Sequence, residues 1–381
     1  MNSFKRLKVM TVVGTRPEVI KLSRVIAELD RHTDHVLVHS GQNYHRELNA
    51  IFFEELGISP PRHVLGVGGQ GVAQVIADVI TKSDAVMERE LPDALLVYGD
   101  TNTCLCVIPA KRRKIPIFHM EAGNRCFDQR VPEELNRKVV DHLSDINMPL
   151  TEHARRYLLD EGLRPETVIK TGSTMKEVLD HHAPAIALSR ALSELGLEPG
   201  GYFVVSTHRE ENVDSPERLV RILGVLRVLA QRYGKRVIVS THPRTRARLE
   251  ALAATGQGVD LEGVSFQKPF GFFDWVKLQE NAFCVVSDSG TLTEESAIRG
   301  FPAVMLRDAH ERPEGMDAGT LVMSGLDEER VVQAVEMVVS RPAGWRPGLP
   351  PDYAESNVSR KVVQIIQSYV DYVNRTVWHK E

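Results

Sequence analysis

Acidic side chains occur at three points of the sequence where they could transfer protons. Asp100 comes one residue after the apolar run 94–98, behind Gly99, and Glu121 follows the run 116–120. Glu133 opens a segment with helical periodicity. Taken singly, Asp100 is more typical of a helix N-cap, and Glu133 of favourable charge in a first helical turn. Three carboxylates together exceed what capping requires, and such a group, partly desolvated, could keep one acid protonated near neutral pH while another acts as a base.

A segment near the N-terminus has residue types that bind phosphate. The apolar run 8–13 is followed by Gly-Thr-Arg-Pro-Glu at 14–18, and Lys21 stands about one turn further on. Proline in the first helical turn, unpaired backbone N–H groups beside it, and the two cations Arg16 and Lys21 are typical of an anion site. A capped helix start with solvated charges explains this motif equally well.

Similar patterns follow the apolar runs of the second half of the chain. Ser-Asp-Ser-Gly-Thr at 287–291 leads into a helical segment, and small residues at a helix start expose N–H groups that can hold a second phosphate. A glutamate one turn into that segment could accept both hydroxyls of a ribose, and Arg312 could bind a diphosphate bidentately. The alternative is another N-cap.

His208 and His242 each follow an apolar run of the second half. One such histidine is usually the partner of a nearby carboxylate, but two histidines at equivalent strand ends indicate that both face one cleft.

Length and composition set the class of protein. A chain of 381 residues is too long for one ordinary hydrophobic core, so two domains are expected. With 42% hydrophobic and 26% charged residues, the composition is that of a soluble globular protein. The 47 Lys and Arg residues against 51 Asp and Glu give a net charge of -4, which argues against nucleic acid as a partner. Any anionic ligand must therefore be met by locally placed cations.

Several kinds of site and location are disfavoured. The stretch Leu7–Val13 is too short for a signal peptide or a membrane span, and no other run reaches about 18 apolar residues, which predicts a cytoplasmic protein without membrane contact. The four cysteines show no Cys-x-x-Cys spacing, and Cys104 with Cys106 is better explained by small buried residues than by metal ligation. No Gly-x-Gly-x-x-Gly follows the first apolar run, and no Gly-Lys-Ser/Thr loop occurs. The sequence thus predicts no metal and no cofactor.

Short apolar runs alternate with segments of helical periodicity in both halves of the chain. Such runs without strict polar alternation favour parallel strands covered on both faces, which predicts an α/β fold. The segment 180–199 is predicted to be a hinge between domains at 1–179 and 200–357, and a C-terminal helix over 358–381 is expected to pack back on the first domain. The predicted strands are 8–13, 35–40, 94–98, 116–120, 145–149, 167–171, 202–207, 236–241, 264–267, 283–287 and 303–306.

Short motifs occur in one order along the chain. They are Gly14–Glu18, Gly99–Thr101, Glu121–Gly123, Pro132–Glu134 with Asn136–Arg137, His208–Arg209, Asp288–Gly290 with Glu294–Glu295, and Glu311–Glu314. In this order they resemble the non-hydrolysing UDP-N-acetylglucosamine 2-epimerases, from about residue 8 to residue 320. The resemblance implies two Rossmann-like domains of the glycosyltransferase-B type with the active site in the cleft between them. It further implies UDP and a UDP-N-acetylhexosamine as ligands, and a homodimer.

Enzymes of this family invert carbon 2 of the sugar by expelling UDP to form a glycal and then adding UDP back. The resemblance assigns Asp100, Glu121 and Glu133 to the proton transfers, without fixing which carboxylate serves which face. It places His208 beside the departing diphosphate. The residues that it implies for binding of the nucleotide sugar are Arg16, Lys21, Arg137, His242, Trp275, Ser289, Gly290, Glu295 and Arg312.

The segment 121–134 is most similar to the branch that forms UDP-N-acetyl-L-fucosamine from its 6-deoxy-L-talose epimer. The resemblance therefore implies conversion of UDP-GlcNAc to UDP-ManNAc, or of that 6-deoxy isomer, as a precursor of surface polysaccharide.

Three positions depart from the family's pattern. Glu210 replaces the second arginine of a His-Arg-Arg-Glu-Asn motif, and 41–45 is Gly-Gln-Asn-Tyr-His where many members have Gly-Gln-His-Arg. In the family both positions are associated with a second UDP-GlcNAc that activates the enzyme, so these changes argue against that regulation. Trp275 stands about where relatives carry an aromatic residue that stacks on uracil.

Other functions would use the same UDP site. A glycosyltransferase needs an acceptor groove and only one base, which leaves the three carboxylates unexplained. A hydrolysing epimerase would release UDP and free sugar, and it differs in whether water reaches the glycal. A non-catalytic nucleotide-sugar sensor would have no use for the carboxylates.

Overall fold

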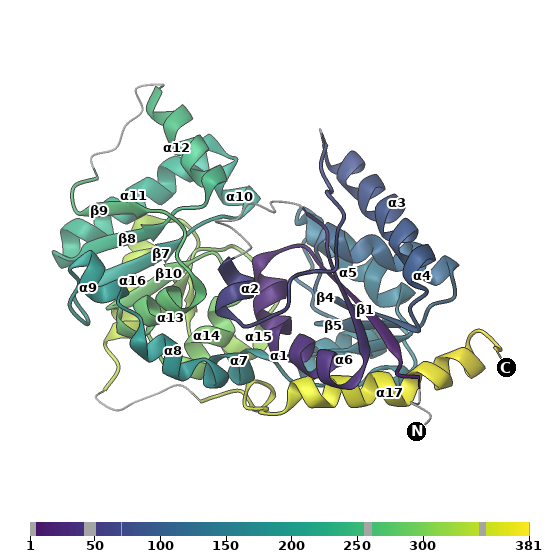
Figure 1. Ribbon diagram of the computed structural model, residues 1–381. Helices are drawn as coiled ribbons and strands as arrows, with labels where there is room; N and C mark the ends of the chain where they lie inside the picture. Colours follow the sequence, from purple (N-terminus) through teal and green to yellow (C-terminus); the bar gives the residue numbers. More distant parts are fainter. Residues whose placement is uncertain (1–4, 42–50, 70, 255–260, 343–347, 381) are drawn as a thin grey trace. The chain divides into compact units, whose positions relative to one another are not determined.

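The computed structural model describes residues 5–41, 51–69, 71–254, 261–342 and 348–380. The chain forms two compact units, which Figure 1 shows as ribbons. The first consists of Met1–His181 together with Pro351–Glu381, and the second of His182–Pro350. The first unit is therefore built from two separate stretches of chain, and each unit has its own sheet.

The first unit contains a parallel six-stranded sheet in the order β3-β2-β1-β4-β5-β6. Its central strands are buried throughout, as expected for strands covered by helices on both faces. The expected α/β sheet is confirmed for this half of the chain. The strands are β1 (Lys8–Val13), β2 (Asp34–His39), β3 (His63–Val64), β4 (Ala94–Tyr98), β5 (Ile117–Met120) and β6 (Ile146–Met148).

Helices pack in two groups around this sheet. α4 contacts both α3 and α5. The apolar side chains of these three helices share a core with Met10, Val12, Leu95 and Val97 of the strands. α1 instead packs against α7 and α17. The helical elements are α1 (Arg16–His32), α2 (Ile51–Glu55), α3 (Val72–Glu90), the 3-10 helix η2 (Asn102–Cys106), α4 (Val107–Arg112), α5 (Pro132–Leu143), α6 (Glu152–Asp160), the short η3 (Pro165–Thr167) and η4 (Pro351–Tyr353), α7 (Met175–His181) and α17 (Val358–Thr376).

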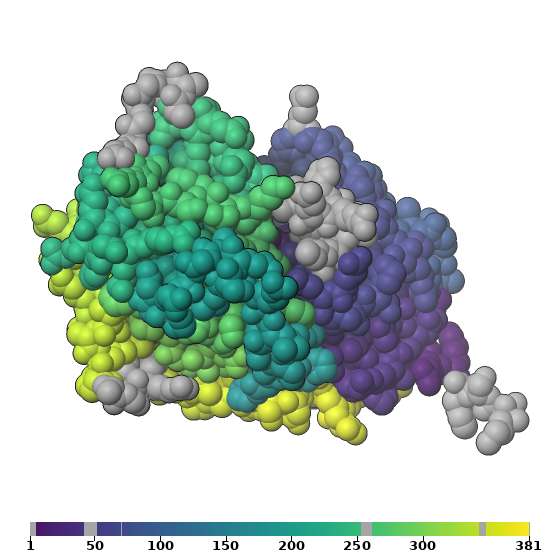
Figure 2. All heavy atoms as spheres, turned by 60° about the vertical axis from the view of Figure 1, so that its left-hand side comes forward, coloured from purple at the N-terminus to yellow at the C-terminus, as the bar shows by residue number. Residues whose placement is uncertain are grey.

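The last long helix, α17, belongs to the first unit although it follows the second in the chain. In Figure 2 the yellow C-terminal segment lies against the purple N-terminal one. The contact is apolar, because α17 buries Val362, Ile366, Val370 and Val373. The helix predicted over 358–381 begins at Val358 as expected and ends earlier, at Thr376.

The second unit contains another parallel six-stranded sheet, in the order β12-β11-β10-β7-β8-β9. Successive residues of β7 enter different cores: Phe203 and Val205 lie in one apolar cluster, and Tyr202 and Val204 in another. Since neighbouring side chains of a strand point to opposite faces, both faces of this sheet are covered. The strands are β7 (Tyr202–Ser206), β8 (Arg236–Ser240), β9 (Val264–Gln267), β10 (Cys284–Ser287), β11 (Ala303–Met305) and β12 (Val322–Met323).

Two helix layers complete the second unit. α11 and α16 contribute to the cluster around Phe203, whereas α13 contributes to the cluster around Tyr202 and contacts α8 and α9. In the described ranges, none of the helices is both long and apolar enough to cross a membrane. The helices are α8 (Ala183–Leu188), α9 (Ala191–Leu195), α10 (Glu210–Val213), α11 (Pro216–Tyr233), α12 (Pro243–Ala254), α13 (Phe272–Asn281), α14 (Leu292–Arg299), α15 (Pro313–Asp317) and α16 (Glu328–Val339).

The prediction of a strand over 167–171 is wrong. Val168 makes only an isolated bridge to Asn147, and the backbone continues beside β6 through hydrogen bonds from Ile169 N to Asn147 O and from Thr171 N to Pro149 O. The turn η3 directly before it leaves too short an extended piece for a ladder. The segment 182–199 contains α8 and α9 of the second unit, and its role as a hinge stays a prediction, as does a cleft between the domains.

Candidate functional site

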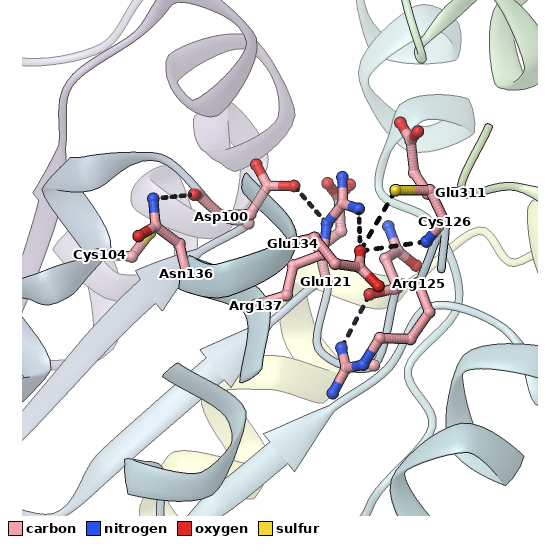
Figure 3. Close-up of polar contacts among 12 residues, drawn as sticks. Asp100, Cys104, Glu121, Arg125, Cys126, Glu134, Asn136, Arg137 and Glu311 are labelled. Carbon is pink, nitrogen blue, oxygen red and sulfur yellow. Dashed lines mark hydrogen bonds and ion pairs between the residues drawn. The ribbon is translucent and has the colours of Figure 1, made fainter. Parts of the chain in front are cut away.

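Asp100 and Glu121 lie at the carboxyl ends of the adjacent parallel strands β4 and β5. Their loops are in contact, because Gly99 N donates to Met120 O and a Cβ atom added to Gly99 would lie 3.6 Å from Glu121 Oε1. Figure 3 shows both carboxylates in the same region of the first unit. The sheet thus brings together the two acids that sequence reasoning places on neighbouring strands.

Glu121 is held by two donors from elsewhere in the first unit. Its Oε2 lies 2.8 Å from Lys21 Nζ and accepts a hydrogen bond of 2.8 Å from the Tyr98 hydroxyl. Lys21 is buried, and its Nζ also lies 5.5 Å from the centre of the Tyr98 ring. The residues next to Glu121 in sequence offer no cation, and the cation comes instead from a helix one hundred positions earlier. Lys21 thus places a charge of opposite sign directly beside the carboxylate of Glu121.

Two side chains of α5 hold Asp100 in place by hydrogen bonds. Arg137 Nε donates to Asp100 Oδ2 at 2.8 Å, and Asn136 Nδ2 donates to the backbone oxygen of Asp100 at 2.9 Å. Figure 3 shows Arg137 between Asp100 and Glu134, and Arg137 Nη1 donates to Glu134 Oε2 at 2.8 Å. Arg137, expected to bind UDP, is thus buried between two carboxylates of its own unit.

The neighbouring glutamates of α5 lie in different environments. Glu134 is buried and accepts hydrogen bonds from the backbone N–H groups of Cys126 and Phe127. Burial would raise the pKa of Glu134, but the Cys126 hydrogen bond and the Arg137 cation outweigh it and hold that pKa below its ordinary value. Glu133 lies half-buried in the first turn of α5. Since Glu134 supports the loop, Glu133 is the acid of this pair that stays a candidate for proton transfer.

The loop after β5 is held by a buried polar network that sequence reasoning missed. Asp141 of α5 accepts from Gly123 N at 3.2 Å and lies 2.7 Å from Arg125 Nη1. Its Oδ1 also lies 2.9 Å from Nδ1 of His119, whose Nε2 is 2.7 Å from the oxygen of Gly99. Glu121 itself has a φ of 62°, a strained backbone conformation for a residue other than glycine. The network therefore keeps Glu121 in a conformation that an isolated loop would leave.

Of the two explanations that the sequence leaves open for the start of α1, the structure favours the capped helix. The carboxylate of Glu18 accepts from Gly14 N at 2.5 Å and Thr15 N at 3.0 Å, so these two N–H groups are already paired. Thr15 and Glu18 form a capping box, a pattern readable from sequence. Arg16 is half-buried at the first position of the helix, 5.5 Å from the centre of the Phe52 ring. Any anion held at this helix would therefore be held by side chains rather than by these N–H groups.

Glu18 makes stability depend on pH. Burial raises its pKa from 4.5 to about 7 against the opposing hydrogen bonds from Thr101, Gly14 and Thr15. The folded state binds this proton more tightly than the unfolded state. The stabilisation that protonation of Glu18 gives the fold is therefore fully present below about pH 4.5 and is lost as the pH rises through 7. We expect the free energy of unfolding of Glu18→Gln, relative to the original chain, to rise by up to about 3 kcal/mol between these pH values.

Urea unfolding at several pH values checks this expectation. The exposed Glu88→Gln is the matched control, because its carboxylate is on the surface of the same unit. A constant difference in unfolding free energy between the original chain and Glu18→Gln across the whole pH range would contradict the prediction.

In the second unit, the loop after β7 is organised by Asp288. This fully buried carboxylate accepts from His208 N at 3.1 Å, from Arg209 N at 3.1 Å and from Asn212 Nδ2 at 3.0 Å. His208 Nδ1 lies 3.4 Å from Asp288 Oδ1, and the His208 side chain is 45% exposed. The histidine thus has a carboxylate partner and still presents part of its ring to solvent. The sequence gives Asp288 only as part of the Asp-Ser-Gly motif, without this role.

Four of the residues expected to bind the nucleotide sugar lie on or near α14, namely Ser289, Gly290, Glu295 and Arg312. Ser289 Oγ lies 3.0 Å from Thr291 Oγ1, and a Cβ atom on Gly290 would lie 2.4 Å from Glu311 Oε1, so the carboxylate of Glu311 packs closely against this glycine. Arg312 is buried with its Nη1 3.0 Å from Glu294 Oε2. The buried Glu295 accepts from Gln279 Nε2 at 2.6 Å.

The remaining candidates lie on other elements of the second unit. His242 follows β8 and its Nδ1 accepts from Arg244 N at 3.2 Å. Trp275 of α13 is half-buried and stacked with Phe270 at 6.5 Å between ring centres. Glu210 lies 2.6 Å from Arg244 Nη1, so this departure from the family's motif is paired with a local arginine. The departing residues 42–45 lie outside the described residues. In the part of the chain that the structure describes, no three His, Cys, Asp or Glu side chains gather as a metal site.

The chain is similar to known UDP-N-acetylglucosamine 2-epimerases. The family model described as UDP-N-acetylglucosamine 2-epimerase matches residues 27–367. The solved structure of UDP-N-acetylglucosamine 2-epimerase from Rickettsia bellii is 54% identical, with a TM-score of 0.89 over 98% of this chain and 100% of that chain. That of Methanocaldococcus jannaschii UDP-GlcNAc 2-epimerase, in complex with UDP-GlcNAc and UDP, is 31% identical, with a TM-score of 0.89 over 95% of this chain and 100% of that one.

A relative with a different named substrate is also similar. The UDP-2,3-diacetamido-2,3-dideoxy-D-glucuronate 2-epimerase of Pseudomonas aeruginosa is 33% identical over 334 residues, which are 86% of this chain and 91% of that protein. The structural matches confirm the glycosyltransferase-B-type fold class. The family match spans most of both units. The chain therefore belongs to the non-hydrolysing UDP-N-acetylglucosamine 2-epimerase family and is an enzyme of that family.

Proposed function

We propose that this enzyme inverts carbon 2 of a UDP-N-acetylhexosamine through a glycal intermediate. In the first step a base takes the proton from carbon 2, a double bond forms between carbons 1 and 2, and the bond from carbon 1 to UDP breaks. In the second step a proton reaches carbon 2 from the opposite face while a UDP oxygen bonds again to carbon 1. No atom is gained or lost overall, and no oxidation state changes, so the sequence of steps needs no redox cofactor.

The observation that carries this proposal is the pair of carboxylates at the ends of β4 and β5. Glu121 is held beside Lys21, and Asp100 beside Arg137. Two acids fixed by separate cations on adjacent loops can serve as two proton carriers, which inversion at one carbon requires and which a transferase does not. Glu133 of α5 is the third candidate, and the assignment of acids to the two faces stays open to experiment.

The second unit would supply most of the nucleotide-binding groups. The small residues before α14 and the buried Arg312 can hold phosphate oxygens, and Glu295 can accept ribose hydroxyls. His208, fixed by Asp288, is the donor that would stabilise negative charge on UDP as the bond to carbon 1 breaks. Donors that are already oriented toward the charge of the transition state lower the activation barrier. Interactions that bind the substrate and the transition state equally well do not lower it.

Three sugars are the candidate substrates. UDP-GlcNAc is named for the Methanocaldococcus structure, and a diacetamido-dideoxy-glucuronate for the Pseudomonas relative. The similarity of segment 121–134 to the fucosamine-forming branch adds the 6-deoxy-L-talose isomer. We propose a UDP-N-acetylhexosamine as the class, and a panel of these three sugars as the way to select its member. Homodimer formation and supply of surface polysaccharide remain predictions.

Exchange of carbon-bound hydrogen in heavy water tests the proposal. The protein is incubated with each UDP-sugar of the panel, and carbon 2 is followed by NMR. We expect deuterium at carbon 2 of intact UDP-sugar together with the C2 epimer. Free sugar with stoichiometric UDP would identify a hydrolysing enzyme instead, and absence of exchange with all three sugars would contradict epimerisation of this class.

A further inference from the structure

Glu18 is a buried carboxyl group that the proposed chemistry does not use. It is the third residue of α1, its exposed fraction is 3%, and it accepts hydrogen bonds from two different loops. The loop after β1 donates through Gly14 N and Thr15 N, and the loop after β4 donates through Thr101 Oγ1 at 2.6 Å. A carboxylate is rarely buried unless its acceptor sites are used, and here both oxygens are occupied.

Helix capping accounts for only part of this arrangement. A capping box needs the bond from Thr15 N and leaves the glutamate at the surface of the first turn. It requires neither the bond from Gly14 N nor the contact with Thr101, which lies 83 positions later. Burial also raises the pKa of Glu18 to about 7, so the arrangement is costly for a cap alone.

The two loops that Glu18 joins carry proposed site residues. Strands β1 and β4 are adjacent and parallel, so their loops leave the same edge of the sheet. The first loop leads to Arg16, and the second contains Asp100 directly before Thr101. The loops are packed closely, because a Cβ atom on Gly14 would lie 2.1 Å from Thr103 Oγ1.

We propose that Glu18 is a positioning residue of the reaction, which fastens the loop after β1 to the loop after β4 and so sets where Asp100 lies. This inference rests on the proposed function. The link passes through one hydroxyl group, since Thr101 is the donor from the second loop. A shift of about 1 Å in a catalytic group can lower a rate on the order of a hundredfold, so a single lost bond here is measurable.

Thr101→Val removes this hydroxyl at constant size, and Thr101→Ser keeps it. We expect Thr101→Val to lower kcat for C2 exchange about tenfold with KM changed less than about threefold, and Thr101→Ser to stay within about threefold of the original chain in both. We expect Glu18→Gln, whose amide can still meet all three partners, to be milder than Glu18→Ala, which leaves buried N–H groups unpaired.

A second readout separates the link from the activity. Loosening of the loop after β4 should raise amide hydrogen exchange of Gly99–Thr103 at least about tenfold in Thr101→Val and not in Thr101→Ser. Equal kcat for Thr101→Val and Thr101→Ser, or unchanged amide exchange in the valine variant, would overturn the positioning role. Absence of C2 exchange in the original chain would instead contradict the proposed function, because the amide readout does not depend on turnover.

Discussion

Glu121→Gln is expected to lower the rate of C2 exchange by about 10²–10⁴-fold, which is the usual contribution of a general acid or base. Glutamine has nearly the same shape and can still accept from Tyr98, but it cannot carry a proton. The residues proposed to hold UDP lie mainly in the second unit, so the Kd for UDP should change less than about threefold. The rate is followed by NMR in heavy water, and UDP binding by calorimetry.

Tyr98→Phe is the matched control for this prediction. It removes one hydrogen bond to Glu121 Oε2 and leaves both the carboxylate and its partner Lys21 in place. We expect a loss of less than about tenfold, because the proton carrier remains. A Glu121→Gln rate within tenfold of the original chain, or a much weaker affinity for UDP, would show that Glu121 binds ligand rather than transfers a proton.

Arg125→Met is expected to lower the free energy of unfolding by about 3–5 kcal/mol, because it leaves a buried negative charge without its partner. The Arg125 side chain is fully buried; it pairs bidentately with Glu161 at 2.8 and 2.7 Å and lies 2.7 Å from Asp141. Asp141 is itself fully buried, so water cannot replace the lost cation. Urea unfolding followed by circular dichroism measures the change.

Two further variants show whether charge is the cause. Arg130→Ala removes an arginine whose side chain is 89% exposed and should cost less than about 1 kcal/mol. Adding Asp141→Asn to Arg125→Met removes the uncompensated charge and should restore part of the lost stability. A loss below about 1 kcal/mol for Arg125→Met, or no recovery in the double variant, would contradict a network held by this ion pair.

The fold could be predicted because its signal is local. Runs such as Ala94–Tyr98 are apolar along their whole length, which favours a buried parallel strand regardless of the rest of the chain. β3 and β12 have two residues each and lie at the edges of their sheets, so no periodicity could reveal them. The segment 167–171 has the composition of a strand, but its pairing depends on a partner, β6, that is only three residues long.

The sequence predicts the acidic residues of the candidate site, but it does not predict which side chains pair with them. Asp100 and Glu121 follow strands, and the carboxyl ends of adjacent parallel strands meet by topology. That Lys21 pairs with Glu121, or that Thr101 binds Glu18, depends on side-chain packing between residues 83 to 100 positions apart. A single sequence carries no signal for such pairs. At the start of α1 the sequence left an anion site and a capped helix start equally open. The capping box of Thr15 and Glu18 was readable from the sequence and favours the capped start, because Glu18 occupies the N–H groups of Gly14 and Thr15.

The return of α17 to the first unit has a consequence for biosynthesis. A ribosome makes residues 182–350 before it makes the helix that covers α1, so the second unit can fold while the first is still incomplete. Until α17 emerges, the nascent first unit exposes an apolar strip of α1 to its surroundings. Premature termination before Val358 would leave that strip permanently open to chaperones and proteases, even though every proposed proton carrier had already been translated.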